Sequence, residues 1–309
     1  MTVAELPATA HDGVDRASTA RRRGMRQAAR PWLFLTPALA LLALFTFWPV
    51  LAGTLLAFTE YNFLAPPKWT GLANFEDLAA DPVFWISMRN SLLYLLIVPA
   101  IQVGAIVLAV LVNNSLPGIR LFRAAFYMPV VTSVSVVGIM WSWMYNEQGL
   151  VNAVLQALHV ISTPIGWLTD DRIALFSIMI VTLWRGLGWY MVLYLAALQS
   201  IPKDLEEAAK LDGATRVQRF WRITVPMIVP TILLCTVLST LSAMKVLEEV
   251  LIMTKGGPVS STYTGLYYAY DQGIRAFNFP RALAASLVVS VFCIAVATLA
   301  FRVLRPRHR

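Results

Sequence analysis

Six long apolar runs constrain this chain more than any other feature of its sequence. They are Trp32–Phe58, Ser91–Val112, Ala124–Tyr145, Ile173–Leu195, Ile223–Met244 and Ala282–Phe301. A helix needs about 20 apolar residues to cross the hydrocarbon core of a bilayer, and each run is long enough. Five runs carry no formal charge, and the fourth carries only Arg185. The sequence therefore predicts an all-α, polytopic membrane protein with six transmembrane helices in a lipid bilayer.

The composition supports the membrane class. Hydrophobic residues make up 58% of the 309 positions and charged residues only 14%, against roughly 25% charged residues in an average protein. A soluble protein this apolar could not cover its core with polar surface. The first run, at roughly 27 residues, is also too long for the apolar segment of a cleavable signal peptide, which spans about 7–15 residues.

The positions of the basic residues predict the orientation. Of the 25 Lys and Arg residues, 17 fall in the N-terminal tail, the second-to-third loop, the fourth-to-fifth loop and the C-terminal tail. Cytoplasmic loops carry the excess of Lys and Arg, so both termini are expected in the cytoplasm. We expect a disordered cytoplasmic tail over residues 1–31, a membrane-spanning domain over 32–303 and a basic cytoplasmic tail over 304–309. The scattering of the basic residues argues against a nucleic-acid partner.

Sequence motifs for catalysis and metal binding are missing. The chain contains no GxxxxGK[ST] phosphate loop, no HExxH and no Cys/His cluster at metal-ligand spacing. Cys235 and Cys293 both fall inside apolar runs and are interpreted as packing residues. We therefore expect no catalytic residue, no metal site and no cofactor bound by this chain.

The fourth run carries polar residues on one helical face. Thr182, Arg185, Gly186 and Trp189 recur at helical spacing. An ionisable residue in the middle of a span costs about 2.5–3.5 kcal/mol on insertion scales, so Arg185 should face the bundle interior or a wet cavity. The stripe fits a polar solute such as a sugar; the alternative is an Arg paired structurally with a neighbouring helix.

A similar stripe lies at the end of the fifth run, where Ser239, Ser242, Val246 and Glu249 follow one another. It is a second candidate surface for a solute. The alternative is that the serines only pack against other helices, and that Lys245 forms an intrahelical ion pair with Glu248 or Glu249 at i, i+3 or i+4 spacing.

The loop between the fourth and fifth runs, at about 202–222, contains the polar stretch EEAAKLDGATRVQRF. Its pattern predicts a short helix after Pro202, a glycine cap with positive φ at Gly213 and a second short helix up to Phe220. Small alanines beside exposed acids would let another backbone approach closely. The alternative is an amphipathic helix on the membrane surface.

The stretch EAAKLDGATRVQRFWRITVP resembles the EAA motif of permease subunits in binding-protein-dependent ABC importers. The segments FRAAFYMPVVTSVSVVGIMWSWMYN, RNSLLY and VLIMTKGGPVSSTYT are similar to the carbohydrate-uptake branch, to subunits of the MalF and UgpA type. One departure is Val225, where the family usually has Leu. The resemblance covers nearly everything from Trp32 to Phe301.

The resemblance implies a type I ABC importer permease fold, in which residues 32–303 form the permease domain. It implies a second permease subunit as partner, a dimer of ATP-binding cassette ATPases that binds ATP and Mg, and an extracytoplasmic solute-binding protein. The expected location is the plasma (inner) membrane of a bacterium or archaeon, with the chain passing several times. The coupling contact with the ATPase is expected at Glu206, Glu207, Ala208, Ala209, Asp212, Gly213, Ala214 and Phe220.

The resemblance also implies that the helices on both sides of the coupling loop line the solute pathway, and both polar stripes lie on those helices. The implied mechanism of transport is alternating access. The expected solute is a sugar or oligosaccharide, and the alternative within the same class is glycerol-phosphate or another polyol-like solute. A secondary active transporter is a third interpretation, but it would favour carboxylates near the middle of the bilayer, and here the acids lie in loops and at span ends.

Overall fold

The computed structural model describes residues 32, 34–62, 64–114 and 117–304. The expected tail over 1–31 lies outside the described residues, and so does the expected tail over 304–309 except for Leu304, which is the last residue of a helix. The chain divides into two compact units, 1–55 and 56–309. Apart from Trp32, the described part of the first unit belongs to a helical candidate span, Phe34–Leu56, which includes one π-helical turn at Ala43–Phe47 and the helix α2 (Trp48–Leu56).

Among the described residues of the second unit, the regular secondary structure is helical apart from a two-residue antiparallel ladder, β1 (Thr59–Glu60) with β2 (Lys68–Trp69). Its helices are α3 (Ala73–Ala80), α4 (Pro82–Leu93), α5 (Ile97–Val112), α6 (Ile119–Val131), α7 (Val134–Met144), α8 (Leu150–Ala157), α9 (Ala174–Gln199), α10 (Lys203–Leu211), α11 (Arg216–Arg219), α12 (Val225–Met244), α13 (Glu248–Met253), α14 (Gly265–Tyr270) and α15 (Phe279–Leu304). In the part of the chain that the structure describes, five helical runs are long and apolar enough to cross a membrane, and a bent pair of helices makes up to six.

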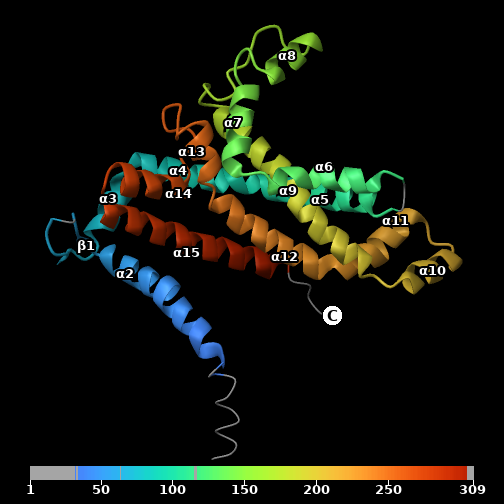
Figure 1. The fold of residues 1–309 in the computed structure, drawn as a ribbon, viewed down its shortest axis with the longest axis horizontal. Helices are drawn as coiled ribbons and strands as arrows, with labels where there is room; N and C mark the ends of the chain where they lie inside the picture. The colour runs from blue at the N-terminus through green and yellow to red at the C-terminus, as the bar shows by residue number, and fades with distance from the viewer. Residues whose placement is uncertain (1–31, 33, 63, 115–116, 305–309) are drawn as a thin grey trace, which may run out of the picture. The chain divides into compact units, whose positions relative to one another are not determined.

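The third predicted span is that bent pair, so the expectation of one continuous helix over Ala124–Tyr145 is wrong. The axes of α6 and α7 differ by 99° (Figure 1). Thr132 and Ser133 adopt extended backbone angles between the two helices. Pro129 lies inside α6 and has no backbone N–H to donate to the preceding turn. A run of apolar residues shows length but not a change of direction, which is why the bend was missed.

The main core lies where α5, α9 and α12 pack against one another, and α6 packs against α9. Ala105 and Ala109 of α5 are fully buried there, and small residues let helix backbones approach closely. The approach of α6 to α9 is closer still, because a Cβ added at Gly188 would meet the carbonyl oxygen of Phe126. These contacts hold the predicted polar faces of α9 and α12 toward a common space.

A second core joins α3, α4, α14 and α15 around Leu78, Tyr268 and Ala285. Its polar edge is the Asp81 carboxylate. Oδ2 of Asp81 accepts a hydrogen bond of 2.7 Å from the Tyr268 hydroxyl and another of 2.7 Å from Nη2 of Arg281. Its other oxygen caps α4 by accepting from the Val83 N–H at 2.8 Å. One carboxylate therefore fixes the starts of α4 and α15 and the side of α14.

The two ends of this bundle carry different elements. In Figure 1, α10 and α11 lie beyond the joined ends of α9 and α12, whereas α13, α14 and α3 lie at the other end. The C-terminus of α9 leads directly into α10, and α11 leads through a π-helical turn (Phe220–Thr224) into α12. The polar stretch is therefore the connector between the two helices that carry the predicted polar stripes.

Candidate solute cavity and coupling segment

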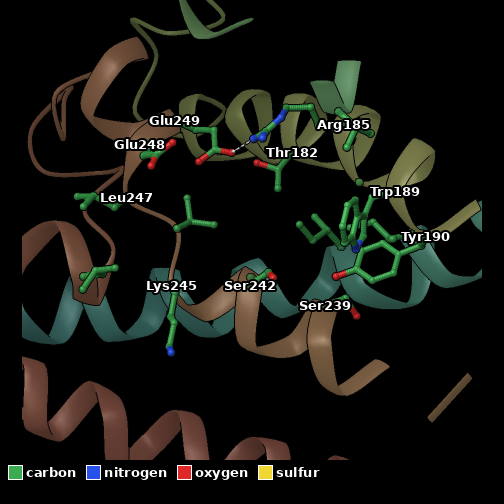
Figure 2. Close-up of a pocket in the computed structure, with 17 residues that line it drawn as sticks. Thr182, Arg185, Trp189, Tyr190, Ser239, Ser242, Lys245, Leu247, Glu248 and Glu249 are labelled. Atoms are coloured by element: carbon green, nitrogen blue, oxygen red, sulfur yellow. Dashed lines mark hydrogen bonds and ion pairs between the residues drawn. The ribbon is translucent and has the colours of Figure 1, made fainter. Parts of the chain in front are cut away.

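A cavity of about 560 Å³ lies between α5, α6, α9, α12, α13 and α14. All eight residues of the two predicted stripes line it: Thr182, Arg185, Gly186, Trp189, Ser239, Ser242, Val246 and Glu249. Figure 2 shows Thr182 and Arg185 of α9 beside Glu249 of α13, with Ser242 of α12 on the opposite side of the space. Small-molecule sites usually have volumes of about 300–1,000 Å³, so the space fits a sugar-sized solute.

An ion pair between two helices forms part of the wall of this cavity. Nη1 of Arg185 on α9 lies 3.2 Å from Oε1 of Glu249 on α13, and the two side chains are 25% and 11% exposed (Figure 2). The contact that the alternative interpretation predicted, between Arg185 and a residue of a neighbouring helix, is thus present in the structure. Both residues of the pair also line the cavity, so Arg185 is paired with another helix and exposed to the cavity at the same time.

The expected intrahelical ion pair at Lys245 is wrong. α12 ends at Met244, Lys245 is its C-cap, and a new helix begins only at Glu248. The i, i+3 and i+4 spacing needs one continuous helix, and the break at Lys245–Leu247 removes it. Figure 2 shows the Lys245 ammonium directed away from the two glutamates.

A buried polar network lies beside the cavity, and the sequence did not suggest it. Nε2 of Gln102 on α5 donates to Oγ of Ser239 at 2.8 Å and to the Cys235 carbonyl at 3.2 Å. The Tyr194 hydroxyl donates to the Oε1 of Gln102 in a short hydrogen bond. Gln102, Ser239 and Tyr194 are all buried. A single amide therefore ties α5, α9 and α12 together and orients a serine that borders the cavity.

Aromatic side chains make up another part of the site. The Tyr94 hydroxyl lies 2.9 Å from Oγ1 of Thr182, so this hydroxyl pair holds the threonine in place. Trp189 is 47% exposed, and Tyr190 beside it also lines the cavity. The polar face of α9 was the signal that found Trp189, whereas Tyr94 lies in an apolar run with nothing to mark it.

The predicted coupling segment has the expected local structure. α10 covers Lys203–Leu211, and Gly213 follows with a φ of +75°, a left-handed conformation that suits glycine. The predicted contact residues Glu206, Glu207, Ala208, Asp212 and Gly213 are exposed, while Ala209, Ala214 and Phe220 are half-buried. Leu211 at the end of α10 is 90% exposed. The segment thus presents acids, small residues and an apolar side chain on its surface.

The joint between α10 and α11 is held by several hydrogen bonds. Oγ1 of Thr215 accepts from the Gln218 N–H at 3.2 Å, and Oε1 of Gln218 accepts from the Thr215 N–H at 2.8 Å, which forms a capping box. Nη1 of Arg219 donates to the Ala214 carbonyl at 2.7 Å. These bonds fix the start of α11 against the turn that precedes it.

The sequence pattern of the family described as "Binding-protein-dependent transport system inner membrane component" matches residues 84–309. This chain belongs to that family. The match includes every cavity-lining residue and the whole coupling segment. The protein is accordingly a multi-pass component of an importer that depends on a binding protein.

Curated relatives cover most of the chain. The chain is 36% identical to the lactose transport system permease protein LacF of Rhizobium radiobacter over 89% of this chain and 94% of that protein. It is 28% identical to the sn-glycerol-3-phosphate transport system permease protein UgpA of Agrobacterium fabrum, over 90% and 95% of the two chains. Among solved structures, a chain of a bacterial ABC transporter involved in import of the acidic polysaccharide alginate shares 25% identity, with a TM-score of 0.79 over 92% of this chain and 98% of that one. The type I permease fold expected from the sequence is confirmed.

Proposed function

We propose that this chain forms half of a membrane pathway for a carbohydrate, a sugar or oligosaccharide, and couples its passage to ATP hydrolysis on another polypeptide. The observation that carries the proposal is the cavity in which both polar stripes meet around Trp189 and the Arg185–Glu249 pair. A cavity that combines hydroxyls, an amphipathic aromatic surface and charged donors and acceptors suits a polyhydroxylated solute. The relative named for lactose transport supports the same class.

The partners follow from the family. A second permease subunit would complete the pathway, an ATP-binding cassette ATPase dimer would bind ATP and Mg, and an extracytoplasmic solute-binding protein would deliver the solute. In the orientation favoured by the basic residues, both termini and the segment around Glu207 lie in the cytoplasm of a bacterium or archaeon. The coupling residues then face the ATPase, with Glu207 and Gly213 at the centre of the contact.

The mechanism would be alternating access driven through α10. At about 1.5 Å per helical residue, Trp189 lies roughly 15 Å from the C-terminal end of α9, and Ser239 lies roughly 21 Å from the start of α12. Since α10 and α11 join those two ends, a displacement of this connector by the ATPase dimer would tilt both walls of the cavity together. Such rigid-body movements are a common form of switching.

A second candidate solute is glycerol-phosphate or another polyol-like compound. The observation in its favour is the relative named for sn-glycerol-3-phosphate transport. The family membership leaves a secondary active transporter without support.

The test is uptake by the whole complex, reconstituted in proteoliposomes with its solute-binding protein and ATPase. Trp189→Ala should lower uptake of a radiolabelled sugar by tenfold or more, while sugar binding by the separate solute-binding protein stays unchanged. Trp143→Ala is the matched control, because Trp143 is 79% exposed on α7 and lies outside this cavity. Normal uptake by the Trp189→Ala complex would exclude this side chain from the pathway.

A further inference from the structure

We infer that the Arg185–Glu249 ion pair determines the charge class of the solute: the cavity accepts electrically neutral polyhydroxylated solutes and rejects anionic ones. The inference rests on the proposed function, because it concerns the same cavity. It goes beyond that function by separating two solute classes that the relatives' names leave together.

The charges on the cavity wall do not favour an anion. Among the described residues that line it, Arg185, Lys245, Glu248 and Glu249 carry formal charges. The Lys245 ammonium points away from the two glutamates (Figure 2), and so away from the Arg185–Glu249 pair. The charged groups around the pair itself are therefore one guanidinium and the carboxylates of Glu248 and Glu249.

The guanidinium is already neutralised by a carboxylate. Nη1 of Arg185 and Oε1 of Glu249 are 3.2 Å apart, so an anion bound to Arg185 would also lie within a few ångströms of Glu249. Repulsion between two like charges at such distances is strong wherever water is partly excluded. A carboxylate or phosphate solute would therefore lose its hydration without gaining an unpaired cation.

The same pair is well suited to hydroxyl groups. A guanidinium has five N–H donors and a carboxylate accepts through two oxygens, yet the pair is joined by a single contact. Nε of Arg185 is buried and has no hydrogen-bond partner among the described residues, an unusual state for a buried donor. Adjacent donors and acceptors match the vicinal hydroxyls of a sugar, each of which both donates and accepts.

Two uncharged side chains beside the ion pair are also suited to a neutral solute. The Ser242 hydroxyl faces the cavity from α12 and the half-exposed Trp189 borders it from α9 (Figure 2). An indole ring presents apolar surface to the C–H faces of a sugar ring and needs no charge on the ligand. Neither group carries a positive charge that would offset the repulsion between an anion and Glu249.

The electrostatic test uses Ser242→Cys in the assembled complex, with modification of this chain followed by mass spectrometry. Cys235 and Cys293 are buried, so the new thiol is the accessible one in this chain. It is treated with anionic ethylsulfonate methanethiosulfonate and with cationic trimethylammonium-ethyl methanethiosulfonate, and each rate is divided by the rate for free 2-mercaptoethanol. We expect the anionic reagent to be the disfavoured one.

Charge variants then assign the effect. Adding Glu249→Gln should raise the relative rate of the anionic reagent roughly tenfold, since it leaves Arg185 unpaired, and adding Arg185→Gln should lower it. The double variant should return toward the parent ratio, and Glu147→Gln, an exposed loop position, should change nothing. A parent cavity that favours the anionic reagent, or a ratio unmoved by Glu249→Gln, would overturn the inference.

Protection of the same thiol separates this inference from the proposed function. Maltose and lactose are compared with matched disaccharides in which one primary alcohol is oxidised to a carboxylate. Equal or better protection by the acidic sugars overturns the inference and leaves the carbohydrate function standing. If the charge variants behave as expected and none of these sugars protects the thiol, the inferred electrostatics stand and the carbohydrate function fails.

Discussion

At the scale of single residues, the amide of Gln102 determines how the polar side of the cavity is built. It is buried among three helices and bonds to the hydroxyls of Ser239 and Tyr194 and to the Cys235 carbonyl. A buried polar group is stabilising only while its partners remain. Gln102 is therefore a positioning residue: it fixes the direction of a serine hydroxyl at the cavity wall.

Gln102→Leu should destabilise the protein by about 1–3 kcal/mol, because the Tyr194 and Ser239 hydroxyls would be left buried without this partner. Thermal unfolding of the purified complex measures the effect. Gln156→Leu, at an exposed position of α8, is the matched control and should leave the unfolding temperature nearly unchanged. Equal unfolding temperatures for the two variants would show that the network contributes little.

The residues of the two stripes could be predicted from the sequence because helical periodicity is local. Thr182, Arg185 and Trp189 share a face of α9 whatever the rest of the chain does. The partner of Arg185 could not be predicted in the same way, since Glu249 lies 64 positions further along the chain. Arg185 pairs with Glu249 and not with Glu248 because of the way the chain breaks after Met244. The length of an apolar run does not reveal such a break.

At the scale of helices, the close contact of α6 with α9 depends on Gly188. A Cβ at this position would meet a backbone carbonyl, that of Phe126, and a backbone cannot move aside as a flexible side chain can. At Gly104 of α5, by contrast, an added Cβ would meet only the end of the Leu187 side chain, 2.6 Å away. The two glycines thus form a natural comparison.

Gly188→Ala should force α6 away from α9 and cost about 1–3 kcal/mol, the range for an overpacked core. Gly104→Ala should cost less, because Leu187 can change rotamer. The measurement is the midpoint of thermal unfolding for each variant in the same detergent. A smaller loss for Gly188→Ala than for Gly104→Ala would contradict the close backbone contact.

The connector between α10 and α11 gives a second test at this scale. Thr215→Ala removes the capping box and should cost about 1 kcal/mol of local stability, seen as faster hydrogen exchange of the α11 amides. Thr215→Ser keeps a hydroxyl that can cap and should preserve the protection. Unchanged exchange in Thr215→Ala would mean that the bond from Arg219 to the Ala214 carbonyl is enough to order the joint.

At the scale of the whole molecule, the site and the connector lie at separate places on the same two helices. α9 and α12 both carry cavity residues; α9 leads into the α10–α11 connector, and α12 begins after it (Figure 1). The number of spans followed from apolar length, and so did the placement of the connector between the fourth and fifth. The 99° turn between α6 and α7 did not follow, because both sides of it are equally apolar.

Glu207→Lys should abolish solute-stimulated ATP hydrolysis by the assembled complex, since it reverses an exposed charge at the proposed ATPase contact. Membrane insertion and assembly with the second permease, followed by co-purification, should remain. Glu147→Lys reverses a charge at an exposed position outside the connector and should leave the stimulation intact. Full stimulation in the Glu207→Lys complex would refute the coupling role.

The carboxylate of Asp81 also bears on how the chain is made. Its ion-pair partner Arg281 is 200 positions further along the chain, which at about 5–20 residues per second is roughly 10–40 s of synthesis. During that interval Arg281 has not yet been synthesised. The hydrogen bond from the Val83 N–H to Asp81 joins residues two positions apart, so it can form before Arg281 is present. The contact between α15 and the start of α4 at Asp81 can therefore form only after Arg281 has been synthesised.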